Sequence, residues 1–163
     1  MKKTNIEHLF DEEYFNSFIE RARKRGTLKK FVDETIISGL DPRELKEKEE
    51  SGARIIYASN HRSHLDYLIL GDIIQERSLP IPRFATGNNL LVWPLSQIVD
   101  FRRMGAFSID RGNKGREYLK ELYGYIQNLI VDGENILFFP EGGRSYNGDY
   151  KTLQSNLLKS FTH

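Results

Sequence analysis

A histidine and an aspartate, His61 and Asp66, are separated by four residues at the start of a predicted helix. His61 follows the apolar run 55–58, which predicts a short buried strand, so it should lie in the turn between strand and helix. Asp66 falls in the first helical turn, close enough to face back toward the imidazole. A carboxylate bonded to one ring nitrogen fixes the tautomer and leaves the other nitrogen free to accept a proton. The pair therefore matches two members of a serine-protease-type triad, with a substrate hydroxyl replacing the serine.

Two other interpretations of these residues stay open. Ser63 with Asp66 three positions later also matches a capping box, in which the acid closes the helix start. His61, His64 and Asp66 also resemble the closely spaced ligands of a metallohydrolase. The two remaining histidines stand near the chain ends, so a metal site is poorly supplied with ligands. We therefore predict neither a metal nor a cofactor.

Two further polar clusters follow predicted strands and together suggest an anion site. Arg111 comes directly after the strand expected at 106–109, and a second cluster follows the strand expected at 136–139. Arginine presents a planar fork of donors that fits phosphate oxygens, and glycine lets backbone N–H groups approach an anion. The alternative is that each arginine pairs with a neighbouring acid at the surface, which contributes about 0–1 kcal/mol. The residues of the second cluster are Glu141, Gly142, Gly143, Arg144 and Ser145.

The elements that must position these residues alternate between strand and helix. Alternation of this kind predicts an α/β domain with a largely parallel sheet flanked by helices, and ligands gather beyond the carboxyl ends of such strands. The N-terminal part predicts helices instead, so we divide the chain into a helical segment, 1–50, and an α/β core, 51–163. Strands are expected at 55–58, 84–86, 106–109 and 136–139, and helices at 7–25, 28–36, 42–50, 63–75, 88–103 and 119–130.

Composition limits the classes of function. A chain of 163 residues holds one domain, and its net charge of +1 gives no general attraction to nucleic acid. Cysteine is absent, which excludes disulfides and thiolate chemistry. No secretion signal or membrane-spanning segment is expected, so we predict a cytoplasmic location with peripheral membrane contact. That contact would use a basic cluster beside an aromatic helix face, an arrangement that also suits a solvated helix packing its aromatics inward. The basic residues are Arg21, Arg23, Lys24, Arg25, Lys29 and Lys30.

Taken in order, three segments resemble the motifs of the glycerolipid acyltransferase superfamily. They are the run 60–66 with His61 and Asp66, the run 105–111 ending in arginine, and the run 139–145 beginning Phe-Pro-Glu-Gly-Gly. The runs 61–67, 93–94 and 101–107 look like the branch that acylates glycerol 3-phosphate or dihydroxyacetone phosphate. Asp110 is instead typical of lysophosphatidate acyltransferases, so both acceptor classes stay open. The family normally continues with another strand, so we expect the core to be incomplete at its C-terminus.

The resemblance implies a definite chemistry. His61 takes the proton from the acceptor hydroxyl, Asp66 orients the ring, and the hydroxyl attacks the thioester of acyl-CoA or acyl-carrier protein. It also implies that Arg111 and the cluster from Glu141 to Ser145, including Gly142, Gly143 and Arg144, bind the acceptor phosphate. The expected partners are the acyl donor, a glycerol-phosphate acceptor and a membrane surface, within phospholipid synthesis.

Overall fold

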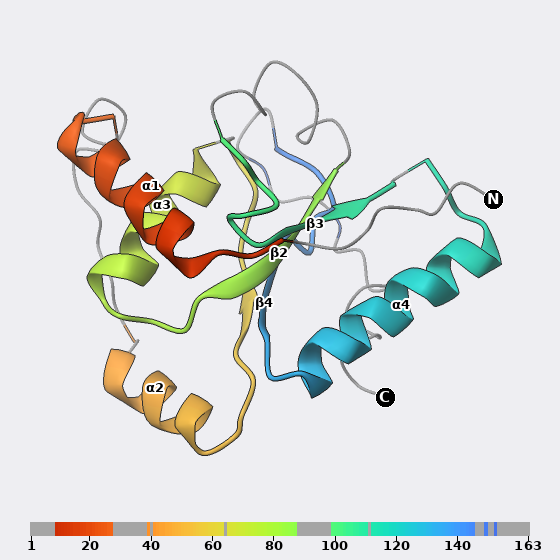
Figure 1. The fold of residues 1–163 in the computed structure, drawn as a ribbon. Helices are drawn as coiled ribbons and strands as arrows, with labels where there is room; N and C mark the ends of the chain where they lie inside the picture. The colour runs from red at the N-terminus through yellow and green to blue at the C-terminus, as the bar shows by residue number, and fades with distance from the viewer. Residues whose placement is uncertain are drawn as a thin grey trace.

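The computed structural model describes residues 9–27, 39, 41–63, 65–87, 99–110, 112–145, 149 and 152. After an initial pair of helices, strands and helices follow in turn, except that two described strands stand in succession before the last helix (Figure 1). The elements in chain order are α1 (Glu12–Lys24), α2 (Pro42–Glu50), β1 (Ile56–Ala58), α3 (Asp66–Glu76), β2 (Pro82–Gly87), β3 (Ala106–Ile109), α4 (Arg116–Val131) and β4 (Asn135–Phe138).

The described strands form one four-stranded sheet in the order β1-β4-β2-β3, and every neighbouring pair is parallel. Tyr57 lies beside Leu137 in the register of β1 and β4, and Phe84 lies beside the same Leu137 across β2 and β4. Because all four strands run in one direction, their carboxyl ends meet along one edge of the sheet. The predicted α/β class with a largely parallel sheet is confirmed.

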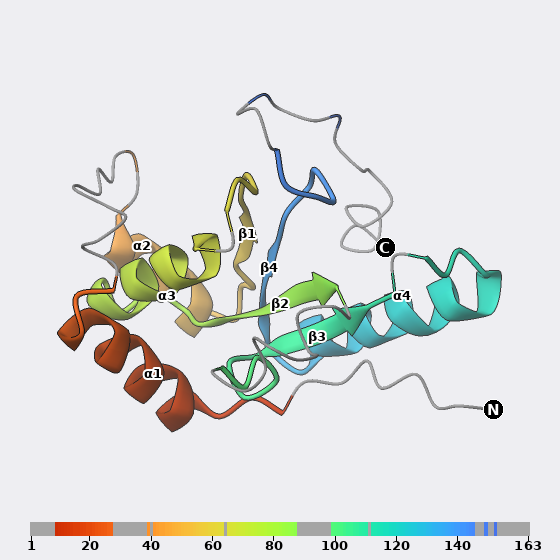
Figure 2. The same cartoon turned by 90° about the horizontal axis from the view of Figure 1, so that it is seen from above.

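Helices cover both faces of the sheet (Figures 1 and 2). On one face α1 and α3 pack against the sheet, and Ile19, Phe84 and Leu137 are buried in this cluster. On the other face α4 packs through its Leu122 and Ile126, and this cluster also contains buried side chains of β3 and β4. Burial of apolar area on both faces stabilises the sheet and holds the strand ends in fixed positions.

Helix α1 begins later than the sequence pattern predicts. Its N-cap is Asp11, whose carboxylate accepts a hydrogen bond from the backbone N–H of Tyr14 at 2.9 Å, and this cap ends the extended segment before the helix. The buried positions of α1 are Phe15 and Ile19. The aromatic face predicted from the sequence consists of Phe10, Tyr14 and Phe18, of which the last two each precede a buried position by one residue. Phe18, on that face, is half-buried and packs against the same cluster. Helix α1 therefore contributes to the core, and the division at residue 50 stays a prediction.

Two other helix predictions differ from the structure. The helix expected from residue 63 begins at Asp66, and the helix expected over 88–103 is contradicted at its described end, because residues 101–105 form turns. These turns include the bond from the N–H of Ala106 to the carbonyl of Phe101 at 2.8 Å, which leads the chain into β3. The helix predicted at 28–36 and the segment 88–98 lie outside the described residues.

An ion pair stabilises the end of the sheet opposite the strand carboxyl ends. The guanidinium of Arg83, on β2, is almost fully buried and lies 2.6 Å from a carboxylate oxygen of Glu134. Its Cζ atom also lies 3.4 Å from the ring centroid of Phe10, so the segment before α1 is packed onto the sheet. Burial lowers the pKa of Arg83, and the charge of Glu134 opposes that shift. In the described part of the chain, no helix has the length and apolarity needed to cross a bilayer.

Candidate active site

The backbone around His61 is fixed by hydrogen bonds to the segment that follows β4. The N–H of Ser59 donates to the carbonyl of Phe138 at 3.1 Å, which extends the ladder between β1 and β4 by one residue. The N–H of Ser145 then donates to the carbonyl of His61 at 2.9 Å. The structure therefore joins His61 directly to the predicted cluster after β4, although Ser145 lies 84 positions after His61 in the chain.

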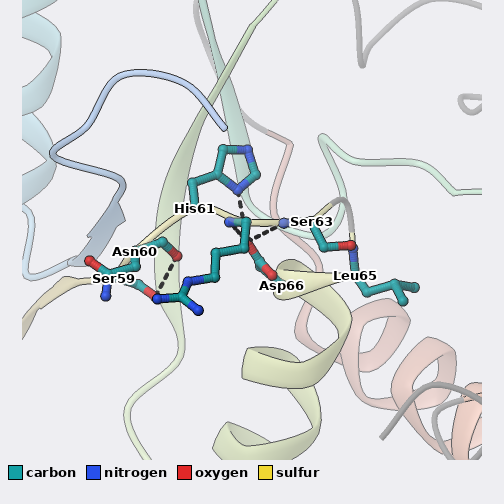
Figure 3. A network of polar contacts seen from close by, with 7 residues as sticks. Ser59, Asn60, His61, Ser63, Leu65 and Asp66 are labelled. Atoms are coloured by element: carbon teal, nitrogen blue, oxygen red, sulfur yellow. Dashed lines mark hydrogen bonds and ion pairs between the residues drawn. The ribbon is translucent and has the colours of Figure 1, made fainter. Parts of the chain in front are cut away.

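The imidazole of His61 and the carboxylate of Asp66 form the hydrogen-bonded pair that the sequence predicts. Nδ1 of His61 lies 2.9 Å from Oδ2 of Asp66 (Figure 3). An ionised carboxylate can only accept, so Nδ1 carries the hydrogen and Nε2 keeps its lone pair. Nε2 lies on the side of the ring away from Asp66 (Figure 3). The pair is therefore arranged so that the unprotonated nitrogen can accept a proton from a hydroxyl group that approaches this side of the ring.

Asp66 is held in place by the turn that it closes. The same Oδ2 atom accepts hydrogen bonds from the backbone N–H groups of Arg62 at 2.8 Å and Ser63 at 3.0 Å. Oγ of Ser63 accepts from the N–H of Leu65 at 3.1 Å. The N-cap residue of α3 is Leu65, which makes no side-chain capping bond, so Ser63 and Asp66 do not form the capping box of the alternative interpretation. Oδ2 of Asp66 instead bonds the imidazole and the turn before the helix. Because two backbone donors fix that oxygen, its position does not depend on the imidazole.

Two aromatic rings hold the imidazole from the sides. The ring of Phe139 stacks on His61 with centroids 4.2 Å apart and planes at 25°, and Tyr67 meets His61 edge-on at 5.8 Å. Tyr67 also meets Phe139 edge-on at 5.1 Å, so the three rings pack on one another. His61 is only 5% exposed as a result. This packing restricts the ring to one orientation and removes water from its faces.

No role for Tyr67 or Phe139 was predicted from the sequence. A signal was present, because each aromatic residue is adjacent in sequence to an element of the site. Phe139 follows the buried strand β4, and Tyr67 follows Asp66 in the first turn of α3.

The cluster after β4 makes a tight turn at the carboxyl edge of the sheet. Gly142 has a φ of +65°, which favours glycine, and its N–H donates to the carbonyl of Phe139 at 2.9 Å. Glu141 and Ser145 are each only 6% exposed, whereas Gly143 and Arg144 are half-buried. The turn thus places the five predicted phosphate-binding residues of this cluster in the segment that also bonds His61.

The cluster after β3 lies farther along the same edge. Arg111 is outside the described residues, and its neighbour Asp110 accepts a hydrogen bond from the N–H of Gly112 at 3.0 Å. The N–H of Asp110 donates to the hydroxyl of Tyr118 at 2.6 Å, which ties this turn to α4. Since β2 separates β3 from β4, the ends of β3 and β4 are about 10 Å apart, from the usual strand spacing. The sheet therefore places the end of β3 on the same edge as His61, which follows β1, three strand spacings or roughly 14 Å away.

An apolar cavity of about 490 Å³ opens between α1, α3 and the sheet. Tyr67 lines this cavity and also touches His61, so the cavity reaches to within one side chain of the imidazole. No sequence pattern indicates the cavity, because its walls come from segments that meet only in the folded chain. Apolar residues of this wall include Phe18, Leu65, Leu68, Phe84 and Phe101.

The described structure does not test the metal interpretation of His61, His64 and Asp66. Among the residues described, no three His, Cys, Asp or Glu side chains gather as a set of metal ligands. His64, the third proposed ligand, lies outside them. Asp66 uses Oδ2 for His61 and two backbone donors, which is the environment of an orienting carboxylate.

Comparison with known proteins places these features in a family context. Residues 42–162 match the protein family described as Acyltransferase. Similar curated proteins include the glycerol-3-phosphate acyltransferase of Baumannia cicadellinicola subsp. Homalodisca coagulata, 42% identical over 111 residues, and that of Hamiltonella defensa subsp. Acyrthosiphon pisum (strain 5AT), 41% identical over 98 residues. The matches cover 67% and 60% of this chain but 13% and 12% of those proteins, so the chain spans about an eighth of their length.

A solved structure is also similar to this chain. It is the 1-acyl-sn-glycerophosphate (LPA) acyltransferase PlsC from Thermotoga maritima, with a TM-score of 0.42 and 16% sequence identity. The alignment covers 88% of this chain and 66% of that chain.

Proposed function

This chain belongs to the acyltransferase family, and from that premise we propose that it moves a fatty acyl group from a thioester to a hydroxyl of glycerol 3-phosphate. The names of the two curated relatives support glycerol 3-phosphate as the acceptor. The observation that carries the proposal is the 2.9 Å contact between Nδ1 of His61 and Asp66, next to a segment rich in phosphate-binding residue types. The acyl donor would be acyl-CoA or acyl-carrier protein.

In the proposed reaction His61 is the general base. Nε2 accepts the proton of the acceptor hydroxyl as the hydroxyl oxygen attacks the thioester carbonyl. The imidazolium that forms is stabilised by the negative charge of Asp66. When the tetrahedral intermediate collapses, the carbon–sulfur bond breaks, the ester bond remains, and the proton on Nε2 passes to the thiolate leaving group. This chemistry needs no covalent enzyme intermediate and no metal.

The phosphate of the acceptor is proposed to bind along the carboxyl edge of the sheet. The turn from Glu141 to Ser145 offers the half-buried side chain of Arg144 and a sharp backbone bend at Gly142. Arg111, at the end of β3, would supply the second guanidinium. Because Ser145 bonds the backbone of His61, a phosphate held by this turn would place its glycerol hydroxyl near the base.

The apolar cavity is the proposed place for the acyl chain. Ligand sites commonly have volumes of about 300–1,000 Å³ and largely apolar walls, and this cavity of about 490 Å³ falls in that range. Tyr67 lines the cavity and contacts His61, so the thioester end of a chain in the cavity is proposed to lie beside Tyr67, one side chain from the imidazole.

An acyl-transfer assay tests the proposal. Purified protein is incubated with radiolabelled palmitoyl-CoA and glycerol 3-phosphate, dihydroxyacetone phosphate or lysophosphatidate in separate reactions. We expect transfer to glycerol 3-phosphate in preference to the other two acceptors, and loss of transfer in His61→Ala with an unchanged circular dichroism spectrum. Transfer that persists in His61→Ala, or a preference for lysophosphatidate, would contradict the assigned base or the assigned acceptor respectively.

A further inference from the structure

The apolar cavity between α1 and α3 has a positively charged side that the proposed reaction does not use. Arg21 and Arg25 line it together with Thr27, all from the end of α1 and the turn after it, and both arginines are exposed. Helices α1 and α3 run antiparallel, since Asn16 lies beside Gln75 and Arg23 lies beside Asp72. The end of α1 is therefore on the same side of the molecule as the start of α3, where Asp66 holds His61.

The charge at this place is unbalanced. The described residues that line the cavity include two arginines and no aspartate or glutamate. The neighbouring cations are neutralised, because Arg23 lies 2.6 Å from Asp72 and Lys24 lies 2.7 Å from Glu20. Within the described part of the chain, Arg21 and Arg25 have no such carboxylate partner. An amphiphile would fit this cavity, because its apolar tail would contact the apolar walls and its anionic head would contact the two arginines.

A purely structural explanation accounts for only part of this arrangement. Cations in the last turn of a helix interact favourably with the helix dipole, typically by about 0.3–1 kcal/mol. That effect explains why α1 ends in basic residues. It does not explain why two of them border an apolar cavity that extends toward Tyr67, since the solvent-facing side of the helix would serve the dipole equally well.

We propose that Arg21 and Arg25 bind the phosphate groups of the acyl thioester donor while its acyl chain occupies the cavity. This inference rests on the proposed function, because it assigns the donor side of the same site. Guanidinium groups bind phosphate oxygens through paired N–H donors, and the phosphopantetheine arm common to coenzyme A and carrier protein carries such a phosphate. The acceptor phosphate and the donor phosphate would then occupy separate basic regions on either side of His61.

The test compares a donor that carries phosphate groups with a donor that carries none. Palmitoyl-CoA carries phosphates, whereas the palmitoyl thioester of N-acetylcysteamine has the same acyl group and no phosphate. In a double variant, Arg21→Gln with Arg25→Gln, we expect KM for palmitoyl-CoA to rise about tenfold, as for the loss of two exposed ion pairs, with kcat unchanged. KM for the neutral thioester should not change. Donors are kept below their micelle-forming concentrations.

A matched control removes the same charge elsewhere. Arg116→Gln with Lys120→Gln alters two exposed cations on α4, across the sheet from the cavity, and should leave both KM values unchanged. For the wild type, KM for palmitoyl-CoA should rise when the salt concentration is increased from about 50 to about 500 mM. In the Arg21/Arg25 variant, KM should no longer depend on the salt concentration. The proposal would be overturned if the Arg21/Arg25 variant raised KM tenfold for both donors, if it raised KM for neither, or if the control variant raised KM tenfold.

Two further arms separate the alternatives. Acyl-carrier protein as donor shows whether the phosphate comes from coenzyme A or from a carrier: the Arg21/Arg25 variant should raise KM for whichever donor the wild type uses. If the variant instead loses binding to phosphatidylglycerol vesicles while KM for palmitoyl-CoA is unchanged, the basic end of α1 is a membrane contact and the proposal is wrong. Calorimetric binding of palmitoyl-CoA to His61→Ala, with and without the arginine changes, tests the anchor even if no acceptor is acylated.

Discussion

The most informative substitution is Asp66→Asn, because the structure predicts what it keeps and what it removes. Oδ2 of Asp66 accepts from Nδ1 of His61 and from the N–H groups of Arg62 and Ser63 at 2.8 to 3.0 Å. In the asparagine variant only the carbonyl oxygen can face two backbone N–H donors, so the amide NH₂ is directed elsewhere. The hydrogen bond to Nδ1, and with it the tautomer of His61, should survive. What disappears is the negative charge beside the imidazolium.

The size of the effect follows from the geometry. Two unit charges about 4 Å apart interact by about 4 kcal/mol at an effective dielectric constant of about 20, which suits a carboxylate only 16% exposed. A barrier increase of that size corresponds to a loss of about three decades in kcat. Asp66→Ala removes the acceptor as well, so the ring is no longer oriented and two backbone N–H groups lose their partner. Its loss should be larger, approaching the roughly four decades typical of a wrong tautomer.

The assay is steady-state transfer from palmitoyl-CoA to glycerol 3-phosphate, with kcat and both KM values measured for each variant. Asp72→Asn is a matched control, because it removes a carboxylate from the same helix that pairs with Arg23 and not with His61. We expect kcat to fall in the order Asp66→Asn and then Asp66→Ala, with KM for glycerol 3-phosphate unchanged and the control equal to wild type. A loss below about tenfold in Asp66→Asn, or equal losses in both variants, would refute the reasoning.

Three further predictions concern stability and the acceptor site. Glu134→Gln leaves the buried guanidinium of Arg83 without its anion, so the free energy of unfolding, measured by urea titration, should fall by about 2–3 kcal/mol. This loss is smaller than for a fully buried pair because Glu134 is 28% exposed. An unchanged free energy of unfolding would mean that the pair is not stabilising. Gly142→Ala places a Cβ on a residue with φ of +65°, so the free energy of unfolding should fall by about 1–2 kcal/mol. The same variant should raise KM for glycerol 3-phosphate. An unchanged KM would argue against this turn as the phosphate site. Gly71→Val should destabilise by about 1–3 kcal/mol, since even the Cβ would approach Cδ1 of Ile19 to 2.7 Å; wild-type stability in urea would show that α1 and α3 are not packed this closely.

Much of the fold could be predicted from local patterns. The strands expected at 106–109 and near 136–139 were found, because short apolar runs bounded by turns have few alternatives in an α/β chain. Helix α4 ends at Val131, one residue after the predicted end at residue 130, and Gly133 follows at a φ of +96°. The start of α1 was predicted less well, because the cap at Asp11 depends on a bond to Tyr14 that periodicity does not reveal.

The site was predictable where it depends on neighbours in sequence. The contact between His61 and Asp66 follows from a strand-turn-helix connection of fixed length, and the structure contains it. The order of the strands was not predictable, and it is the order β1-β4 that joins Ser145 to His61. The stacking of Phe139 on His61 and the cavity next to Tyr67 depend on the same tertiary arrangement, so no local pattern could reveal them.

The central claim is that His61 presents an unprotonated Nε2 to the acceptor hydroxyl. Nitrogen-15 NMR of protein labelled at histidine tests it most directly, because protonated and unprotonated ring nitrogens have well-separated chemical shifts. For the neutral ring of His61, assigned by its loss in His61→Ala, we predict a hydrogen on Nδ1 and a lone pair on Nε2. A hydrogen on Nε2 in the neutral ring would contradict the assignment of His61 as the base.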